Sequence, residues 1–462
     1  MASNLTPPAE NVLDMIGNTP MLKVNNIDTG KCELFLKLEN QNPGGSIKDR
    51  MALTMVEAAE KDGSLKPGGT ILEATAGNTG LGLALVAAQK GYKCILVIPD
   101  KMSEDKIFHL KALGAECIIT RSDVGKGHPE YYADMVERMA KDIPNSVHVD
   151  QFSNPANALA HETMTAPEIW EQMDHKVDAV VAGVGSGGTV TGLGNFFKKA
   201  SPKTEIILAD PEGSVLAEAV KTGTPAKEAG SWVVEGIGED YIPPVLDISL
   251  CTDAFIIPDK EALATIRELL QKEGLLAGTS SGTLIAAALK YCRAQKEPKR
   301  VVTFVCDTGN KYLSKAYNDY WLMDQGFIER KTTDNLLDII TRRHSERAVV
   351  VCTPDDTLEI AFKRLKLYGI SQLPVLNSDG GLEGLIGERH IIKATAAGEE
   401  NFARPVSDAM DWHPQTVPLS ASPVEVAEIL KEGTAVLIND ENGFHGLITR
   451  VDMINYIAKG RF

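Results

Sequence analysis

The stretch Val177-Asp-Ala-Val-Val-Ala-Gly-Val-Gly-Ser-Gly-Gly-Thr189 joins an apolar run to a glycine-rich loop, and a helical pattern follows it. An unbroken apolar run of this length is typical of a strand buried on both faces of a parallel sheet. Glycines between such a strand and a helix let backbone N–H groups approach a phosphate, whose charge the helix dipole favours. Because Gly183, Gly185, Gly187 and Gly188 break the G-x-G-x-x-G spacing of dinucleotide sites, we expect a single phosphate here.

Around this stretch, short β-branched runs alternate with helical patterns up to about residue 320. Apolar strands separated by helices predict an α/β fold whose parallel sheets are covered by helices on both faces. We expect one large core over residues 1–320, with a smaller subdomain at about 48–150. The expected strands are 70–72, 94–98, 115–120, 177–184, 205–209 and 301–306, and the expected helices are 79–90, 103–113, 129–142, 260–272 and 283–295.

The composition is that of a globular protein with more than one domain: 462 residues, 43% hydrophobic and 24% charged. The net charge of −16 disfavours nucleic acid as a partner. No apolar run approaches the ~20 residues of a membrane span, and the first residues lack the basic and apolar regions of an export signal. The seven scattered cysteines form no C-x-x-C pair, so we expect buried thiols in a reducing cytoplasm, with neither disulfides nor a metal site.

The last third of the chain repeats itself. Gly384-Leu-Ile386 recurs as Gly446-Leu-Ile448, 62 residues later and in matching surroundings. Each copy predicts a small β-α-β-β-α unit, and because neither unit buries much core alone, we expect the copies at 346–400 and 401–462 to pack on each other. The polar, highly charged segment before them, 321–345, predicts a linker followed by a bridging helix.

The stretch Asn42-Pro-Gly-Gly-Ser-Ile-Lys-Asp-Arg50 places a lysine at the start of a helix. Two glycines relax the backbone, Ser46 can cap, and an apolar-periodic segment follows at 51–59. A helix N-terminus disfavours a cation, so the ammonium of Lys48 tends toward a lowered pKa and a nucleophilic amine. A solvated lysine is the competing interpretation.

Two further loops lead into apolar helices. Glu73-Ala-Thr-Ala-Gly-Asn-Thr-Gly80 offers successive amides and hydroxyls that can bind a carboxylate, with an ordinary turn as the alternative. Leu276-Ala-Gly-Thr-Ser-Ser-Gly282 offers small hydroxyls that are either caps or ligand contacts. A reactive lysine, a carboxylate site, a single-phosphate loop and a small polar loop on one α/β scaffold together indicate pyridoxal 5′-phosphate.

These motifs resemble the fold-type II pyridoxal-phosphate enzymes that comprise the cysteine synthases and cystathionine β-synthases, and the chain looks like a cystathionine β-synthase of the bacterial, haem-free kind. The resemblance runs over essentially the whole chain and implies two open, mostly parallel α/β subdomains. The repeats resemble the paired CBS (Bateman) domains of that family. The motifs that carry the resemblance are Ile16-Gly-Asn-Thr-Pro20, the lysine stretch, Thr75-Ala-Gly-Asn-Thr79, Gln151-Phe-Ser-Asn-Pro-Ala-Asn157, the phosphate loop and Val234-Glu-Gly-Ile-Gly238.

The resemblance also implies roles for individual residues. Lys48 would hold the cofactor covalently as a Schiff base and move a proton at the substrate α-carbon. Ser280 would face the pyridine nitrogen, and a neutral hydroxyl there would make the cofactor a milder electron sink than an aspartate would, which suits β-elimination. Cofactor contacts are implied for Asn78, Gly185, Ser186, Gly187, Gly188 and Thr189, and substrate contacts for Thr75, Ala76, Gly77, Thr79, Gln151 and Glu239.

Some positions depart from the common pattern. Ala76 stands where serine is common, which removes one hydroxyl from the carboxylate site. Phe152 and Glu239 stand where the animal enzymes have tyrosines, which alters the leaving-group side of the pocket. Glu235 matches the cystathionine synthases, whereas plain cysteine synthases tend to have glutamine, so we assign it a catalytic role toward homocysteine. No haem-binding segment precedes the core, so we expect no haem.

The implied activity joins L-serine to L-homocysteine, giving L-cystathionine in transsulfuration, with hydrogen sulfide from cysteine as a further product. We expect a cytoplasmic homodimer or higher homo-oligomer. One alternative is a cysteine synthase that uses O-acetylserine and sulfide. Another, of a different class, is a catalytically inert sensor of adenosyl nucleotides, against which the intact Lys48 and phosphate loop speak.

The two repeats differ at the end of their second strand. Gly446-Leu-Ile-Thr-Arg-Val-Asp452 resembles the adenosine-binding signature of CBS domains, which implies that Thr449, Val451 and Asp452 bind an effector, with S-adenosylmethionine ahead of AMP or ATP. The first repeat has Gly387 and His390 in place of the threonine and aspartate. A structural explanation competes, because Asp452 can equally cap the last helix.

Overall fold

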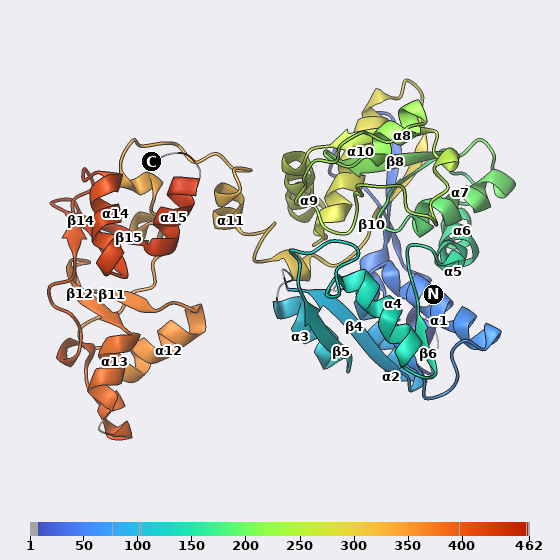
Figure 1. Cartoon of the computed structure of the whole chain (residues 1–462). Helices are drawn as coiled ribbons and strands as arrows, with labels where there is room; N and C mark the ends of the chain where they lie inside the picture. The colour runs from blue at the N-terminus through green and yellow to red at the C-terminus, as the bar shows by residue number, and fades with distance from the viewer. Residues whose placement is uncertain are drawn as a thin grey trace. The chain divides into compact units, whose positions relative to one another are not determined.

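The computed structural model describes residues 8–75, 77–100, 102, 104–396, 398–458 and 460. They form two compact units that divide between Leu322 and Met323 (Figure 1). Among the described residues, no helix has the length and apolar character needed to cross a membrane. All seven cysteines are free thiols, and Cys32, Cys94, Cys292 and Cys352 are buried.

The larger sheet of the first unit has six strands in the order β1-β2-β10-β7-β8-β9. Every neighbouring pair is parallel except the edge pair β1–β2. The long apolar helix α10 (Thr279–Ala294), buried on nearly all sides, packs against β10, β7 and β8. The strands are β1 (Met21–Lys23), β2 (Glu33–Leu38), β7 (Ala179–Gly183), β8 (Glu205–Pro211), β9 (Asp253–Ile257) and β10 (Arg300–Val305).

The smaller sheet has four parallel strands in the order β5-β4-β3-β6. These strands are β3 (Thr70–Glu73), β4 (Lys93–Pro99), β5 (Glu116–Thr120) and β6 (Ser146–His148). Helices α1 (Lys48–Asp62) and α2 (Asn78–Lys90) pack on each other, and their apolar faces share one buried core with this sheet. Met51, Met55 and Val56 of α1 are fully buried in that core, as the apolar period of the sequence predicts.

The remaining helices of the first unit connect the strands of both sheets (Figure 1). They are α3 (Glu104–Ala112), α4 (Tyr132–Asp142), α5 (Pro155–Ala160), α6 (Ala166–Gln172), α7 (Gly188–Ala200), α8 (Leu216–Thr222) and α9 (Asp259–Glu273), with a π-helical turn at His161–Thr165 between α5 and α6. Helix α11 (Asp319–Asp324) follows the last of these strands and spans the division between the units. The predicted α/β fold with two mostly parallel sheets is thereby confirmed.

The second unit contains both repeats. The first copy forms α12 (Leu358–Tyr368), β11 (Gln372–Leu376), β12 (Leu382–Gly387) and α13 (Glu388–Thr395). The second forms β13 (Thr416–Val417), α14 (Pro423–Glu432), β14 (Ala435–Asp440), β15 (Gly443–Thr449) and α15 (Arg450–Ala458). Gly384 and Gly446 take the same place in the two hairpins, and in both hairpins the pairing shifts register just after the partner of that glycine. The expected β-α-β-β-α order is confirmed for the second copy. The first copy has the expected helix–strand–strand–helix order, but in place of the leading strand it has only an isolated bridge between Cys352 and Val375.

The prediction of a bridging helix between the units is wrong. After α11 ends at Asp324, residues 325–344 contain no α-helix, only the short 3-10 turn Leu336–Asp338 and the first residue of a second one, His344–Glu346. Leu336, Ile339 and Ile340 are instead buried in the core of the second repeat. Because three closely spaced apolar residues are too few for an amphipathic helical face, packing against the repeat decides their conformation.

Candidate functional site

The first unit contains a cavity of about 300 Å³ at the carboxyl ends of parallel strands. Loops that follow β3, β6, β7 and β10 line it, together with the starts of α1 and α10. Open α/β sheets generally bind ligands at this edge. Twelve residues predicted from the sequence line this one cavity: Lys48, Thr75, Gly77, Asn78, Thr79, Gln151, Gly185, Ser186, Gly187, Thr189, Glu239 and Ser280.

Lys48 is the first residue of α1, as the sequence predicts, and its backbone N–H donates to Ser46 Oγ at 3.2 Å. Burial lowers the pKa of the Lys48 ammonium, against the opposing charges of Cys306, Glu239 and Asp307. Among the described residues, no hydrogen bond or ion pair involves its Nζ. The side chain therefore presents an amine to the cavity that is easier to deprotonate than an exposed lysine.

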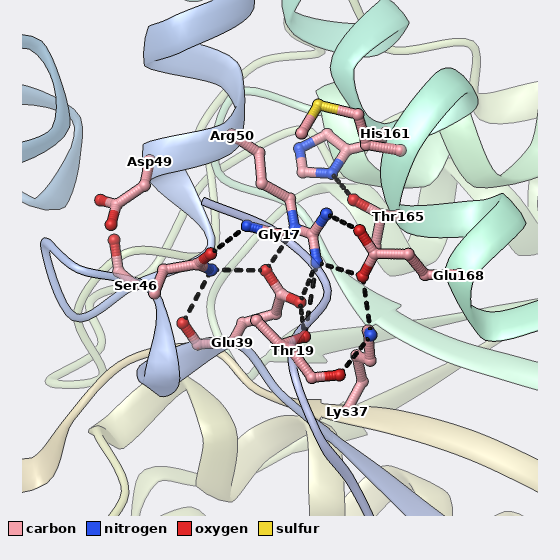
Figure 2. Close-up of polar contacts among 12 residues, drawn as sticks. Gly17, Thr19, Lys37, Glu39, Ser46, Asp49, Arg50, His161, Thr165 and Glu168 are labelled. Carbon is pink, nitrogen blue, oxygen red and sulfur yellow. Dashed lines mark hydrogen bonds and ion pairs between the residues drawn. The ribbon is translucent and has the colours of Figure 1, made fainter. Parts of the chain in front are cut away.

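A buried network of charges anchors the first turn of α1 (Figure 2). The Arg50 side chain, two residues beyond Lys48, donates to Glu39 and to both carboxylate oxygens of Glu168. Lys37 Nζ also donates to Glu168, at 2.8 Å. Arg50, Lys37 and Glu39 are fully buried. Their spacing in the sequence gave no sign of this network, because Glu39 and Glu168 come from segments far apart.

The loop between β3 and α2 holds the residues predicted to bind a carboxylate. Thr79 Oγ1 donates to Gln151 Oε1 at 2.6 Å, and Thr75 Oγ1 accepts from the Gly77 N–H at 3.2 Å. Thr75, Gly77, Thr79 and Gln151 thus line one wall of the cavity. Ala76 lies outside the described residues.

Asn78 is held by two residues that the sequence did not single out. Its Nδ2 donates to Asp307 Oδ2 at 2.9 Å, and Lys311 Nζ donates to its Oδ1 at 2.5 Å. Tyr312 donates to the same Asp307 oxygen. One N–H of the Asn78 amide is left over, because Nδ2 carries two hydrogens.

The glycine loop leads into α7, a helix of 13 residues. Gly187 has φ 96°, which favours glycine. Among the described residues, the backbone N–H groups of Ser186, Gly187, Gly188 and Thr189 have no protein acceptor. The first N–H groups of a helix lack intrahelical partners and can bind an anion.

Gly188 differs from its neighbours because it does not line the cavity. A Cβ there would lie 2.0 Å from Oδ1 of the buried Asn157. The amide of Asn157 also donates to Ser186 Oγ at 2.8 Å and therefore fixes the loop from behind. Because Gly188 has no side chain, the Asn157 amide can pack against it. The Gly188 N–H group remains at the start of α7.

Ser280 and Glu239 also line the cavity. Ser280 lies in the first turn of α10 and is buried. Burial, and secondarily the charge of Asp240, raises the pKa of the Glu239 carboxyl to about 8. Glu239 is therefore mostly a neutral carboxylic acid at pH 7.

Glu235 lies outside the lining of the cavity. Its carboxylate forms ion pairs with Lys106 of α3 and with Lys315, the latter at 3.0 Å. Although burial opposes the shift, these two lysines lower the pKa of Glu235. The residue is an ionised link between α3 and the segment after β10.

In the second repeat, Asp452 caps α15. Its Oδ2 accepts from the Thr449 N–H at 2.8 Å and from the Thr449 hydroxyl at 2.6 Å, and its Oδ1 accepts from Thr341 at 2.7 Å. Val451 is exposed. His390 takes the equivalent capping place in the first repeat, where its Nδ1 accepts from the Gly387 N–H at 3.1 Å. The cap explains one function of Asp452 without any ligand.

Comparison with known proteins identifies both units. The family model described as pyridoxal-phosphate dependent enzyme matches residues 12–307. The CBS domain model matches residues 334–397 and 406–459.

Individual relatives share these features over different lengths. The chain is 38% identical over 460 residues to a cystathionine beta-synthase of Apis mellifera, which covers 97% of this chain and 90% of that protein. It is 40% identical over 310 residues to a cysteine synthase of Staphylococcus aureus, which covers 66% of this chain and 96% of that protein. A solved hydrogen sulfide-producing enzyme from Fusobacterium nucleatum is 38% identical with a TM-score of 0.61, covering 66% of this chain and all of that chain.

Proposed function

The chain belongs to the pyridoxal-phosphate dependent enzyme family and is a β-replacement enzyme, and from this we propose that it joins L-serine to L-homocysteine, giving L-cystathionine and water. One observation carries the proposal: the likeness to cystathionine beta-synthases extends over 97% of the chain, repeats included. The likeness to a cysteine synthase covers only 66% of it.

The residues around the cavity fit pyridoxal 5′-phosphate. The cavity offers one buried amine, on Lys48, and a helix start whose N–H groups have no protein acceptor. A Cβ at Gly185 would lie 2.6 Å from the carbonyl oxygen of Gly236, and one at Gly187 would lie 2.6 Å from Leu246 Cβ, so neither position admits a side chain. These features suit a phosphate at the loop and an aldehyde at the amine.

We assign each side of the cofactor to residues that line this cavity, and to Gly188 through its N–H group at the start of α7. Ser186, Gly187, Gly188 and Thr189 would bind the phosphate through N–H groups and hydroxyls, together with Gly185. Asn78 would use its remaining N–H toward the ring oxygen, and Ser280 would face the ring nitrogen. When bound, the cofactor supplies an electron sink for the α-carbon of an amino acid.

The residues of this chain would supply the rest of the chemistry. The Lys48 amine would hold the cofactor and then move the proton at the α-carbon, because burial lowers its pKa and so favours the deprotonated amine that acts as a base. Thr75, Gly77, Thr79 and Gln151 would bind the substrate carboxylate.

Glu239 favours an oxygen leaving group. A neutral carboxylic acid can donate a hydrogen bond to the hydroxyl of serine, and the raised pKa keeps Glu239 neutral at pH 7. Phe152 also lines the cavity and adds an apolar surface to it. These two residues support serine as the first substrate.

A second candidate function is cysteine synthesis from O-acetylserine and sulfide. The identity of 40% to a cysteine synthase supports it, and the neighbouring hydrogen sulfide-producing enzyme supports release of sulfide from cysteine as a further reaction. Both reactions would use the same Lys48 and the same carboxylate site.

Pairing serine or O-acetylserine with homocysteine or sulfide separates the candidates. The purified chain should give the highest kcat/KM with serine and homocysteine, with cystathionine identified by mass spectrometry. Cysteine formed from O-acetylserine and sulfide, with no cystathionine from serine, would support the second candidate.

We assign the catalytic core to residues 1–320, the linker to 321–345 and the CBS domains to 346–400 and 401–462. We propose that the protein is a homo-oligomer in the cytoplasm and that Thr449, Val451 and Asp452 bind S-adenosylmethionine or an adenine nucleotide. The CBS domain match over both repeats supports an adenosyl ligand.

A further inference from the structure

We propose that His161 is a positioning residue that orients the hydroxyl of Thr189 toward the cofactor phosphate. His161 Nε2 lies 3.2 Å from Thr189 Oγ1, and its Nδ1 lies 3.0 Å from Thr165 Oγ1. Figure 2 shows the contact between His161 and Thr165. The proposal rests on the proposed function, because it takes the loop at Thr189 as the phosphate site.

The local fold brings the imidazole to the start of α7. His161 begins a π-helical turn, His161–Thr165, which widens the backbone between α5 and α6. Gly192 of α7 lets this turn approach closely, because a Cβ there would lie 2.6 Å from His161 Cβ and 2.3 Å from the Ala158 carbonyl oxygen. The ring is thus fixed against the first turn of α7, where Thr189 lies.

The imidazole is neutral in this position. His161 is fully buried, and burial together with the nearby positive charges of Lys48 and Arg50 lowers its pKa well below the ordinary value. A neutral imidazole has one nitrogen that donates and one that accepts. The two threonines must therefore play opposite roles.

A phosphate at the loop decides which role each threonine takes. Phosphate oxygens accept hydrogen bonds, so the Thr189 hydroxyl donates to the phosphate and accepts from His161 Nε2–H. His161 Nδ1 then accepts from the Thr165 hydroxyl. The three groups form one chain in which every donor points toward the phosphate, and the Nε2–H tautomer is the one that completes it.

Binding of the cofactor to the cofactor-free full-length protein tests this chain. His161→Leu removes the donor to Thr189, whereas His161→Gln keeps an amide N–H within reach of the same hydroxyl. We expect His161→Leu to weaken the affinity for pyridoxal 5′-phosphate by roughly three- to tenfold, as for one lost hydrogen bond. His161→Gln should retain most of the affinity, and it serves as the folded reference if the leucine variant is unstable.

Two controls separate positioning from a general structural effect. Pyridoxal, which lacks the phosphate, should bind the wild type and His161→Leu equally well. In a Thr189→Val background, His161→Leu should cause no further loss for pyridoxal 5′-phosphate, because its effect passes through that hydroxyl.

Three results would overturn the proposal. Additive losses in the double variant, or an equal loss for pyridoxal, would show that His161 does not act through Thr189, while leaving the cofactor site intact. An unchanged affinity in Thr189→Val alone would show that this hydroxyl makes no contact with the phosphate, and the proposal would fail while the N–H groups of the loop still bind the phosphate.

Discussion

Arg50 and Glu39 form a two-pronged ion pair in the interior of the first unit. Arg50 Nε lies 2.7 Å from Glu39 Oε2, and Arg50 Nη2 lies 2.8 Å from Glu39 Oε1, with both side chains fully buried. Because Arg50 is two residues beyond Lys48 on α1, the pair fixes the helix turn from which the Lys48 amine enters the cavity.

Arg50→Met should destabilise the protein by about 3–5 kcal/mol, because it leaves the charge of Glu39 buried without the cation that pairs with it. Urea unfolding of the wild type and the variant, followed by circular dichroism, measures the loss. Arg121→Met is the matched control, since Arg121 pairs with Asp123 at an exposed site. Equal stability of the Arg50 variant and the wild type would contradict a structural role for the pair.

Glu73 should make the protein less stable as the pH rises from 4.5 to about 7. Burial raises the pKa of this carboxyl from 4.5 to about 7, so the folded state retains a proton that the unfolded state has released. The loss is at most about 3 kcal/mol for a shift of this size. Glu73→Gln, which cannot titrate, should remove this part of the pH dependence.

Unfolding free energies measured at pH 5 and pH 8 test the Glu73 prediction. The unfolding free energy of Glu73→Gln relative to that of the wild type should increase from pH 5 to pH 8, whatever the difference between them at pH 5. Glu57→Gln, on the exposed side of α1, controls for loss of a carboxylate. A constant difference between Glu73→Gln and the wild type would mean that Glu73 titrates normally.

Glu235→Gln should depress cystathionine formation more than cysteine formation from O-acetylserine. The prediction follows from the assignment of Glu235 to the homocysteine side, although its carboxylate pairs with Lys106 and Lys315 and lies outside the cavity lining. Steady-state rates of the variant and the wild type give the fraction of activity that the variant retains in each reaction. Lys106→Met distinguishes the mechanisms: the same selective loss would trace the effect to the ion pair, whereas equal losses in both reactions would contradict any role in nucleophile choice.

Asp452→Asn should weaken binding of S-adenosylmethionine by tenfold or more, because a charge-assisted hydrogen bond contributes about 1.5–3 kcal/mol. The asparagine oxygen can still accept from Thr449, so the α15 cap should largely survive. Asp452→Ala should lose both the ligand and the cap, the latter worth about 1 kcal/mol. Isothermal titration with S-adenosylmethionine, AMP and ATP measures binding, and no heat with any of them in the wild type would contradict the effector site.

Local pattern predicted much of the fold and of the cavity. Buried parallel strands such as β4 and β7 are visible as apolar runs, and Lys48 and Gly187 lie in short motifs that define a helix start. These signals depend on neighbours in the sequence, so they can be read without the structure.

Long-range contacts left no such pattern. Glu168 reaches Arg50 across 118 residues, and Asp307 reaches Asn78 across 229 residues. The strand β2 was missed because its apolar run, residues 34–36, is short and Lys37 interrupts it. The segment at Leu336 was misassigned as part of a helix because only packing on the second repeat decides its conformation.

Borohydride reduction of the purified holoenzyme, followed by peptide mass mapping, tests the central claim most directly. Reduction fixes the cofactor on the amine that holds it, and the peptide that gains a pyridoxyl group identifies that amine. We predict the modification on Lys48 and its disappearance in Lys48→Ala, which should also form no cystathionine. A pyridoxyl group on another lysine of the wild type, or none at all, would contradict the assignment of this cavity as the active site.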